Sequence, residues 1–241
     1  MKSRFPALPL YRFVLPLSTS SGFLPPSTKL TYSARKSAIL RLNQTIMEYN
    51  AEEFERLLRS RRSVFPKQFE EGRKVDDAIV RRILENATWA PSHGGTEPWK
   101  FVVFTGAGLE KLARFQAEAY KENAGENFKE ATYNNLLANP LKASHVIALC
   151  MKRNEARRFP EIEEVEAVAC AVQNIYLSVT VYGLGGYWTT GGVTYNEKAK
   201  SFFGLGDDDK LLGFFYLAHV AVPSPPGKRQ PIEEKMVWVE S

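Results

Sequence analysis

The sequence predicts one α/β or α+β domain built around a single mixed sheet. Helical and extended segments interleave along the body of the chain, and one continuous apolar run, Val146–Met151, has the length and character of a buried strand. With 241 residues, of which 44% are hydrophobic, the composition is that of an ordinary soluble globular protein. A chain of this length buries a substantial core without disulfide bonds.

Apolar residues at helical spacing predict several helices. Phe54, Leu57 and Leu58 share one face over residues 50–60, and Asp76 and Asp77 mark the start of a second helix. The strongest pattern covers about residues 162–182 and ends at a glycine. Further helical segments are predicted over residues 109–120, in part of 126–139, and over 197–203.

Extended segments are predicted between these helices, at residues 101–105, 146–151, 212–222 and 234–239, with a short strand or turn at 185–192. The two cysteines, Cys150 and Cys170, lie in apolar segments, so we expect reduced core thiols rather than a disulfide. Reduced thiols fit a reducing compartment, and a cytoplasmic location is the corresponding expectation.

The formal net charge of +5 is unevenly distributed. Seven of the 32 Lys and Arg residues and no acidic residue lie in residues 1–47, so 25 basic residues remain against 27 acidic ones. The body is therefore close to neutral. A nucleic-acid-binding function, which a basic chain would otherwise suggest, is not expected.

Residues 1–46 are predicted to be a basic N-terminal extension, and residues 47–241 the folded domain. The most apolar part of the extension, Leu8–Leu17, is interrupted by Pro9, Arg12 and Pro16 and is too short to span a bilayer. Three interpretations remain open. The extension is an organelle-type transit peptide, a disordered basic arm, or sequence upstream of a natural start at Met47. Mass spectrometry of the mature N-terminus distinguishes them.

Two polar segments of the body carry the candidate chemistry. The first is the turn Ala90–Trp99, in which a helix pattern meets Pro91, passes through a glycine-rich stretch and enters a strand. Such a turn exposes backbone N–H groups and one imidazole, His93, which suits a flat, polar, partly anionic ligand. The second is Arg59–Ser63, whose guanidinium groups and hydroxyls also favour anions.

In this order and spacing, the two segments resemble the FMN-dependent nitroreductase family, which typically has an Arg-Arg-Ser segment followed by an Ala-Pro-Ser turn that ends in Pro-Trp. The resemblance extends over about residues 50–240. It implies an α+β fold with a sheet flanked by helices, in an intertwined homodimer that binds two FMN at its interface.

The resemblance also implies cofactor-binding residues. Arg61, Arg62 and Ser63 match positions that contact FMN, although spacing alone favours a solvated basic helix end, and it is the resemblance that reverses this preference. Pro91, Ser92 and His93 match the turn that reaches across the dimer to the partner's flavin. A basic residue of the family is replaced here by Phe65, for which Lys67 is a substitute, while Gly95 and Glu97 depart from the usual turn sequence.

Two further segments complete the implied site. Trp188, Thr189, Thr190 and Gly191 stand where the family lays backbone against the isoalloxazine, with an N–H near Thr190 facing flavin N5. The alternative is a plain strand end bounded by glycines. Arg229 matches a late basic residue on the FMN phosphate, and the alternative is an exposed loop charge.

The implied activity is reduction of nitroaromatics, quinones or similar small acceptors by NAD(P)H, in a ping-pong reaction on a tightly but non-covalently bound FMN. No side chain is required as a catalytic group, and His93 or water is the candidate proton source. The three histidines lie far apart in the sequence and predict no metal site. The alternatives are a flavin-binding redox sensor with little turnover and a dehalogenating or flavin-fragmenting branch of the same fold.

Overall fold

The computed structural model describes residues 49–240, and the interpretations of the N-terminal extension and of Met47 concern residues outside this range. The core is a four-stranded sheet in the order β1-β2-β4-β3. Its strands are β1 Trp99–Thr105, β2 His145–Met151, β3 Leu184–Thr189 and β4 Lys210–His219. All three strand pairs are antiparallel. The α+β class is confirmed. The sheet is antiparallel rather than mixed, and the one parallel pairing in residues 49–240 is an isolated bridge between Ser63 and Gly186.

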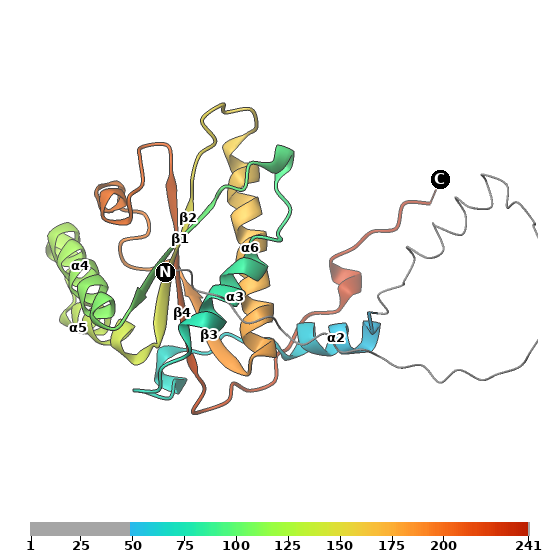
Figure 1. Ribbon diagram of the computed structural model, residues 1–241, viewed down its shortest axis with the longest axis horizontal. Coiled ribbons are helices and arrows are strands. Elements are labelled where there is room, and N and C mark those ends of the chain that lie inside the picture. The colour runs from blue at the N-terminus through green and yellow to red at the C-terminus, as the bar shows by residue number, and fades with distance from the viewer. Residues whose placement is uncertain (1–48, 241) are drawn as a thin grey trace, which may run out of the picture. The chain divides into compact units, whose positions relative to one another are not determined.

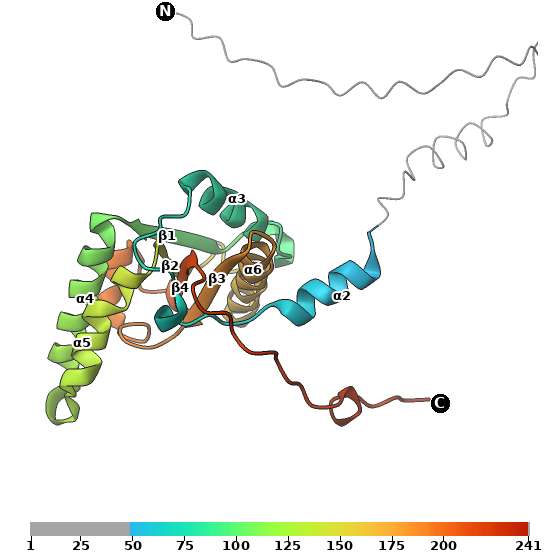
Figure 2. The same ribbon diagram turned by 90° about the horizontal axis from the view of Figure 1, so that it is seen from below.

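Helices cover both faces of this sheet (Figures 1 and 2). The helices are α2 Ala51–Ser60, α3 Asp77–Ala87, α4 Ala107–Ala124, α5 Glu130–Ala138 and α6 Glu161–Val181. One core joins α4 to one face of the sheet, and a second joins α3 and α6 to the other. Every residue of β2 is buried, because this strand lies inside the sheet and both of its faces are covered.

Local sequence signals explain where the helices begin and end. The side chain of Asn50 accepts a hydrogen bond from the Glu53 N–H at the start of α2, and that of Asp76 accepts one from Ala78 at the start of α3. The chain leaves α6 through Gly183, which adopts a φ of +66°. Short 3₁₀ segments occur at Pro66–Gln68, His93–Gly95, Gly125–Asn127, Pro140–Lys142, Glu197–Phe203 and Ile232–Glu234. None of the helices in residues 49–240 combines the length and apolar character needed to cross a membrane.

Two sequence predictions are wrong. The expected final strand over residues 234–239 is absent, because no strand of the sheet lies beside this segment, and Val237, Trp238 and Val239 are exposed. The second concerns Cys170, which was predicted to be a core thiol but is exposed. It lies on the outer side of α6, whose inner side buries Val168 and Val172. Cys150 is a buried free thiol as predicted.

Candidate functional site

The segment Arg61–Ser63 lies directly beside β3. Ser63 forms the parallel bridge with Gly186, and the next residue, Val64, donates its N–H to the Gly186 carbonyl over 2.9 Å. The neighbouring Gly185 permits this approach, because an added Cβ there would lie 3.0 Å from the Val64 side chain, whereas one at Gly186 would lie 2.3 Å from the Phe215 ring. A segment that ends an exposed helix is thereby attached to the edge of the sheet.

Tyr176 of α6 connects these two segments. Its hydroxyl accepts a hydrogen bond from the Trp188 backbone N–H at 2.8 Å and lies 3.3 Å from the Ser63 hydroxyl. The Arg61 guanidinium lies over the Tyr176 ring, 4.8 Å from its centroid. No carboxylate within residues 49–240 is paired with Arg61. We call Arg61, Ser63, Tyr176 and Trp188 the Tyr176 cluster.

The end of β3 supplies backbone close to this cluster. Both N–H groups of Trp188 are used internally, since its indole donates to the Leu212 carbonyl at 3.0 Å. Thr190 and Gly191, which follow, are exposed. A Cβ added to Gly191 would meet only the Thr189 hydroxyl, at 3.7 Å. A planar ring can therefore approach this backbone, which is what an isoalloxazine contact requires.

Arg62 points away from the Tyr176 cluster. Its Nε donates to the Pro225 carbonyl at 3.2 Å, and Gly227 lies against the guanidinium, where a Cβ would be 2.7 Å from Cζ. The side chain of Arg62 therefore fastens the segment that follows β4. Arg229, two residues beyond Gly227, is exposed and donates to the Lys228 carbonyl. The structure thus brings its chain segment next to Arg61–Ser63 without a contact between Arg229 and Arg61.

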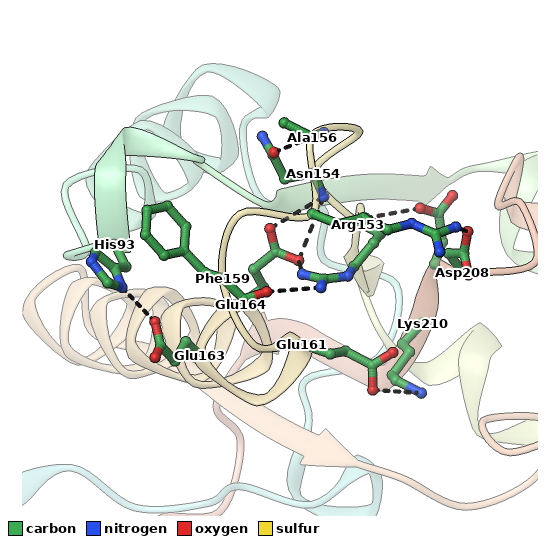
Figure 3. Close-up of polar contacts among 12 residues, drawn as sticks. His93, Arg153, Asn154, Ala156, Phe159, Glu161, Glu163, Glu164, Asp208 and Lys210 are labelled. Atoms are coloured by element: carbon green, nitrogen blue, oxygen red, sulfur yellow. Dashed lines mark hydrogen bonds and ion pairs between the residues drawn. The ribbon is translucent and has the colours of Figure 1, made fainter.

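The turn Pro91–Gly95 lies against the start of α6 instead. The His93 Nδ1 is 2.6 Å from a Glu163 carboxylate oxygen, and its ring stacks on Phe159 with centroids 3.7 Å apart (Figure 3). Gly94 has a φ of +60°, and a Cβ there would lie 2.5 Å from the Phe159 ring. The Ser92 hydroxyl accepts the Glu97 N–H at 3.2 Å.

A buried ion pair holds the loop that packs against this turn. Arg153 pairs with Glu164, whose side chain is only 2% exposed, and also donates to the Phe159 carbonyl at 2.8 Å (Figure 3). The backbone N–H of Asn154 donates to the same carboxylate at 3.2 Å. These contacts fix the loop of residues 152–160, and the loop in turn presents Phe159 to His93. We call His93, Phe159, Glu163 and the Arg153–Glu164 pair the His93 cluster.

The two clusters lie toward opposite ends of α6. Glu163 belongs to the first turn of the helix and Tyr176 to its last turns. At about 1.5 Å per residue, these two positions are about 20 Å apart along the axis. One flavin ring system cannot contact both clusters within a single chain. The residues predicted from sequence therefore fall into two groups, one around Tyr176 and one around His93.

Comparison with known proteins identifies the family to which this chain belongs. The family model described as the Nitroreductase family matches residues 58–219, which include both clusters. The chain belongs to the nitroreductase family. Among curated relatives, the Escherichia coli protein named "Putative NAD(P)H nitroreductase YdjA" is 28% identical over 138 residues, 57% of this chain and 74% of the relative. The similarly named YfhC of Bacillus subtilis is 25% identical over 180 residues, 74% of this chain and 90% of the relative.

Solved structures of the nitroreductase family share the fold. A nitroreductase-like family protein from Bacillus cereus aligns with a TM-score of 0.67 and 26% identity, covering 81% of this chain and all (100%) of that one. The FMN and NADPH-dependent nitroreductase NfnB from Sphigopyxis sp. strain HMH aligns with a TM-score of 0.61 and 21% identity. That alignment covers 78% of this chain and 99% of NfnB, and it supports the fold alone.

Sequence reasoning missed several residues of the site in this nitroreductase. Tyr176 was interpreted as one apolar position of a long helix, and its hydroxyl gave no separate signal. Phe159 and Glu163 lie in or near a loop whose path cannot be inferred from periodicity. Phe65, the departure from the family pattern, packs its ring 4.7 Å from that of Tyr187. Lys67, its expected substitute, is exposed on the 3₁₀ segment that follows.

Proposed function

We propose that this protein is an FMN-dependent oxidoreductase that uses NAD(P)H to reduce nitroaromatics, quinones or similar small acceptors in a ping-pong reaction. The observation that carries the proposal is the Tyr176 cluster, which joins Arg61, Ser63 and the end of β3 at positions that match the flavin contacts of the family. NfnB, named as FMN- and NADPH-dependent, has the same fold. A cytoplasmic location, with organelle targeting by residues 1–46 as the alternative, belongs to the same proposal.

The residues present fit the cofactor. Arg61 offers a cation without an acidic partner in the described chain, which suits a phosphate. The exposed backbone at Thr190 and Gly191 offers the Thr190 N–H and little side-chain bulk, which suits a planar ring, while the Gly191 N–H donates to the Thr189 hydroxyl at 3.4 Å. Arg229 is exposed on a segment that passes Arg62, and it adds a second cation. All of these contacts are non-covalent, so the proposal is a tightly bound but releasable FMN.

When bound, FMN supplies the redox chemistry, accepting a hydride from NAD(P)H and giving its electrons to the acceptor in a separate half-reaction. The protein positions the two substrates and limits access of water. Arg61 and Ser63 hold the anionic end of the cofactor, while the backbone at Thr190 orients its ring. His93, whose Nδ1 contacts Glu163, is a candidate proton donor beside water, and it can donate from Nε2 only in its imidazolium form.

We infer that the working form is a homodimer. The separation of about 20 Å between the clusters leaves the Pro91–His93 turn without a flavin in its own chain, so a second copy is needed to bring it to one. Exposed apolar side chains support an interface of this kind: Val181 of α6 is 68% exposed and Trp238 of the C-terminal segment is 80% exposed. Size-exclusion chromatography with light scattering measures the oligomeric state, and a monomer with bound FMN contradicts the inference.

The visible spectrum of the purified protein tests the proposed function. We expect a yellow protein with the visible absorbance spectrum of a flavin, from which acid or heat releases FMN into the supernatant. Oxidation of NADH or NADPH with menadione or nitrofurazone then measures turnover. A colourless protein that does not bind added FMN contradicts the proposal, and a yellow protein without turnover supports the sensor alternative.

A further inference from the structure

Strand β4 contains one extra residue at the point where it passes the end of β3. The register between β2 and β4 shifts within Ala148–Cys150, so that Leu149 of β2 stands opposite both Leu212 and Gly213 of β4. Two residues opposite one make a β-bulge, which bends the strand and changes the direction of the neighbouring backbone. We call Leu212 and Gly213 the β4 bulge.

The β4 bulge contacts the end of β3 through its backbone. The Leu212 carbonyl accepts the Trp188 indole N–H at 3.0 Å. Gly213 has a φ of +116°, and a Cβ added there would lie 2.4 Å from the Thr189 carbonyl oxygen and 2.9 Å from the Trp188 indole nitrogen. Because real Cβ atoms essentially never come closer than 3.0 Å to such atoms, β3 reaches this position only with glycine at residue 213.

Alternate residues of β3 direct their backbone polar groups away from β4. The Gly186 carbonyl accepts the Val64 N–H. Two residues later, the Trp188 N–H donates to the Tyr176 hydroxyl. Residues two apart in an antiparallel ladder point their N–H groups to the same side, and Thr190 is the next residue of this series. Within residues 49–240 no protein group accepts the exposed Thr190 N–H, which is therefore directed to the outer edge of the sheet, beside the Tyr176 cluster.

The Thr190 N–H belongs to the same peptide unit as the Thr189 carbonyl. A peptide unit is planar and trans, so its N–H points opposite to its C=O and moves with it. The Thr189 carbonyl packs over the place where Gly213 lacks a side chain, and Thr189 and Phe214 form the last pair of the β3–β4 ladder. Gly213 therefore fixes the position of a donor that points away from it.

We propose that Gly213 is a positioning residue for the flavin, because the β4 bulge sets the place of the Thr190 N–H and thereby the redox potential of the bound cofactor. The inference rests on the proposed function, under which this N–H faces the ring. Gly213 acts through the Thr189 carbonyl and does not touch the cofactor. Its placement matters because a binding group is effective only within about 0.5 Å of its productive position.

The test compares the wild-type holoprotein with Gly213→Ala. An ordinary Cβ contact of 3.4 Å in place of 2.4 Å requires the Thr189–Thr190 peptide to move by about 1 Å. We expect the affinity for oxidised FMN to fall about tenfold and that for reduced FMN about 100-fold, because an N–H dipole stabilises the negative charge added on reduction. This tenfold difference lowers the two-electron midpoint potential by about 30 mV. Redox titration of the holoprotein against a reference dye measures it.

Gly204→Ala is the matched control, because it also places a Cβ on a glycine with positive φ, here +62°, but that Cβ would meet only the flexible Lys100 Nζ, at 3.1 Å. We expect it to lower the Tm of the apoprotein and to leave FMN affinity and potential unchanged. Trp188→Phe is the second variant, since it removes the hydrogen bond between the indole and the β4 bulge. It is expected to lower the potential by a smaller amount, and it decides the question if Gly213→Ala does not fold.

Three results overturn the assignment. An unchanged potential in folded Gly213→Ala and Trp188→Phe shows that the β4 bulge does not position the donor. Weaker FMN binding without a change in potential shows that Gly213 supports the fold around the cofactor and not the contact with its ring. Equal changes in Gly213→Ala and Gly204→Ala show a general loss of stability. Failure of the proposed function itself is seen separately, as wild-type protein that does not bind FMN.

Discussion

The two ends of α6 differ in the kind of contacts that hold their side chains and in how exposed those side chains are. At the Tyr176 end, neutral hydrogen bonds and a buried ring join Arg61–Ser63 to β3, and Tyr176 is only 8% exposed. At the His93 end, the hydrogen-bonded side chains of His93 and Glu163 are 59% and 36% exposed, and the Arg153–Glu164 ion pair beside them is buried. The polar groups of the Tyr176 cluster bond to one another, whereas the His93 cluster exposes an imidazole and a glycine-rich turn to solvent.

This contrast assigns different roles to the two clusters. A site that receives a ligand needs groups fixed by their own chain, and the Tyr176 cluster has them. The His93 cluster holds a turn firmly but leaves its outer side uncovered within residues 49–240, since Pro91, His93 and Gly95 are all exposed. Under the proposed dimer, the turn completes the site of the second copy.

The largest effect is expected from Glu164→Ala. Removing this carboxylate leaves the Arg153 guanidinium, whose side chain is 14% exposed, without its partner, which costs about 3–5 kcal/mol of unfolding free energy. Urea denaturation measures it. The control is Glu163→Ala, which breaks only the exposed pair with His93 and changes stability by less than about 1 kcal/mol. Equal losses in the two variants would remove the distinction between buried and exposed layers of the His93 cluster.

The next effect separates two neighbouring arginines. Arg61→Ala is expected to weaken FMN binding about 10- to 100-fold, because a charge-assisted contact is worth about 1.5–3 kcal/mol. Arg62→Ala is expected to loosen the segment around Pro225 and to leave FMN affinity within about threefold, since its guanidinium is engaged there. Titration of the apoprotein at the flavin absorbance band measures both. A stronger effect of Arg62 would reverse the assignment made from the structure.

Tyr176→Phe tests the hydrogen bonds that join Ser63 and Trp188 to α6 in the Tyr176 cluster. The variant keeps the ring under Arg61 but leaves the partly buried Trp188 N–H without its acceptor, at an expected cost of about 1–3 kcal/mol. Thermal unfolding of the apoprotein checks the loss. Ser63→Ala removes the weaker contact, 3.3 Å long, and serves as the matched control with a smaller change. If the two changes are equal, the backbone N–H is not what the tyrosine stabilises.

The smallest effect concerns pH and lies outside both clusters. Burial lowers the pKa of His145, with the nearby Lys74 adding to it and the Asp77 carboxylate, 3.0 Å away, opposing it. The unfolded chain therefore binds the proton first. Stability from this group is complete above the unfolded pKa of about 6.5 and falls as pH drops below that value toward the folded pKa.

We expect His145→Gln to flatten the loss of stability between about pH 6.5 and 5. Chemical denaturation at a series of pH values measures the slope. A slope that is unchanged in folded His145→Gln would show that another group is responsible. Asp77, whose pKa is lowered by its hydrogen bonds to Lys74 and His145, acts at lower pH, below about 3.8.

The sequence predicted the elements better than the contacts between them. Periodicity located α6 to within one residue at each end, and the Asp76 cap located α3. Alternation of apolar and polar residues predicts a strand at residues 234–239, but a strand forms only where another strand supplies hydrogen bonds. Local sequence patterns do not indicate which distant segments pair. Arg61 and Arg62 are therefore equivalent in the sequence, although one contacts Tyr176 and the other Pro225.

The candidate site was predictable where a motif reflects backbone needs. Gly94 and the end of β3 fall into that group, because their glycines allow close approach of an aromatic ring or of neighbouring backbone. Tyr176 and Glu163 were not predictable, since each acts through one polar group on a helix that otherwise fits a core pattern. Their roles depend on which element packs opposite them.

The long-range contacts of Ser63 have a consequence for the order in which the protein folds during synthesis. Ser63 meets Tyr176 across 113 positions, and its carbonyl accepts a hydrogen bond from Ser224 across 161 positions. Contacts of such sequence separation form late, since the intervening chain must first be ordered. During synthesis, the Arg61–Ser63 segment therefore waits until residues near 224 have left the ribosome. Any molecule that recognises these Ser63 contacts can bind only after the chain has been translated past residue 224.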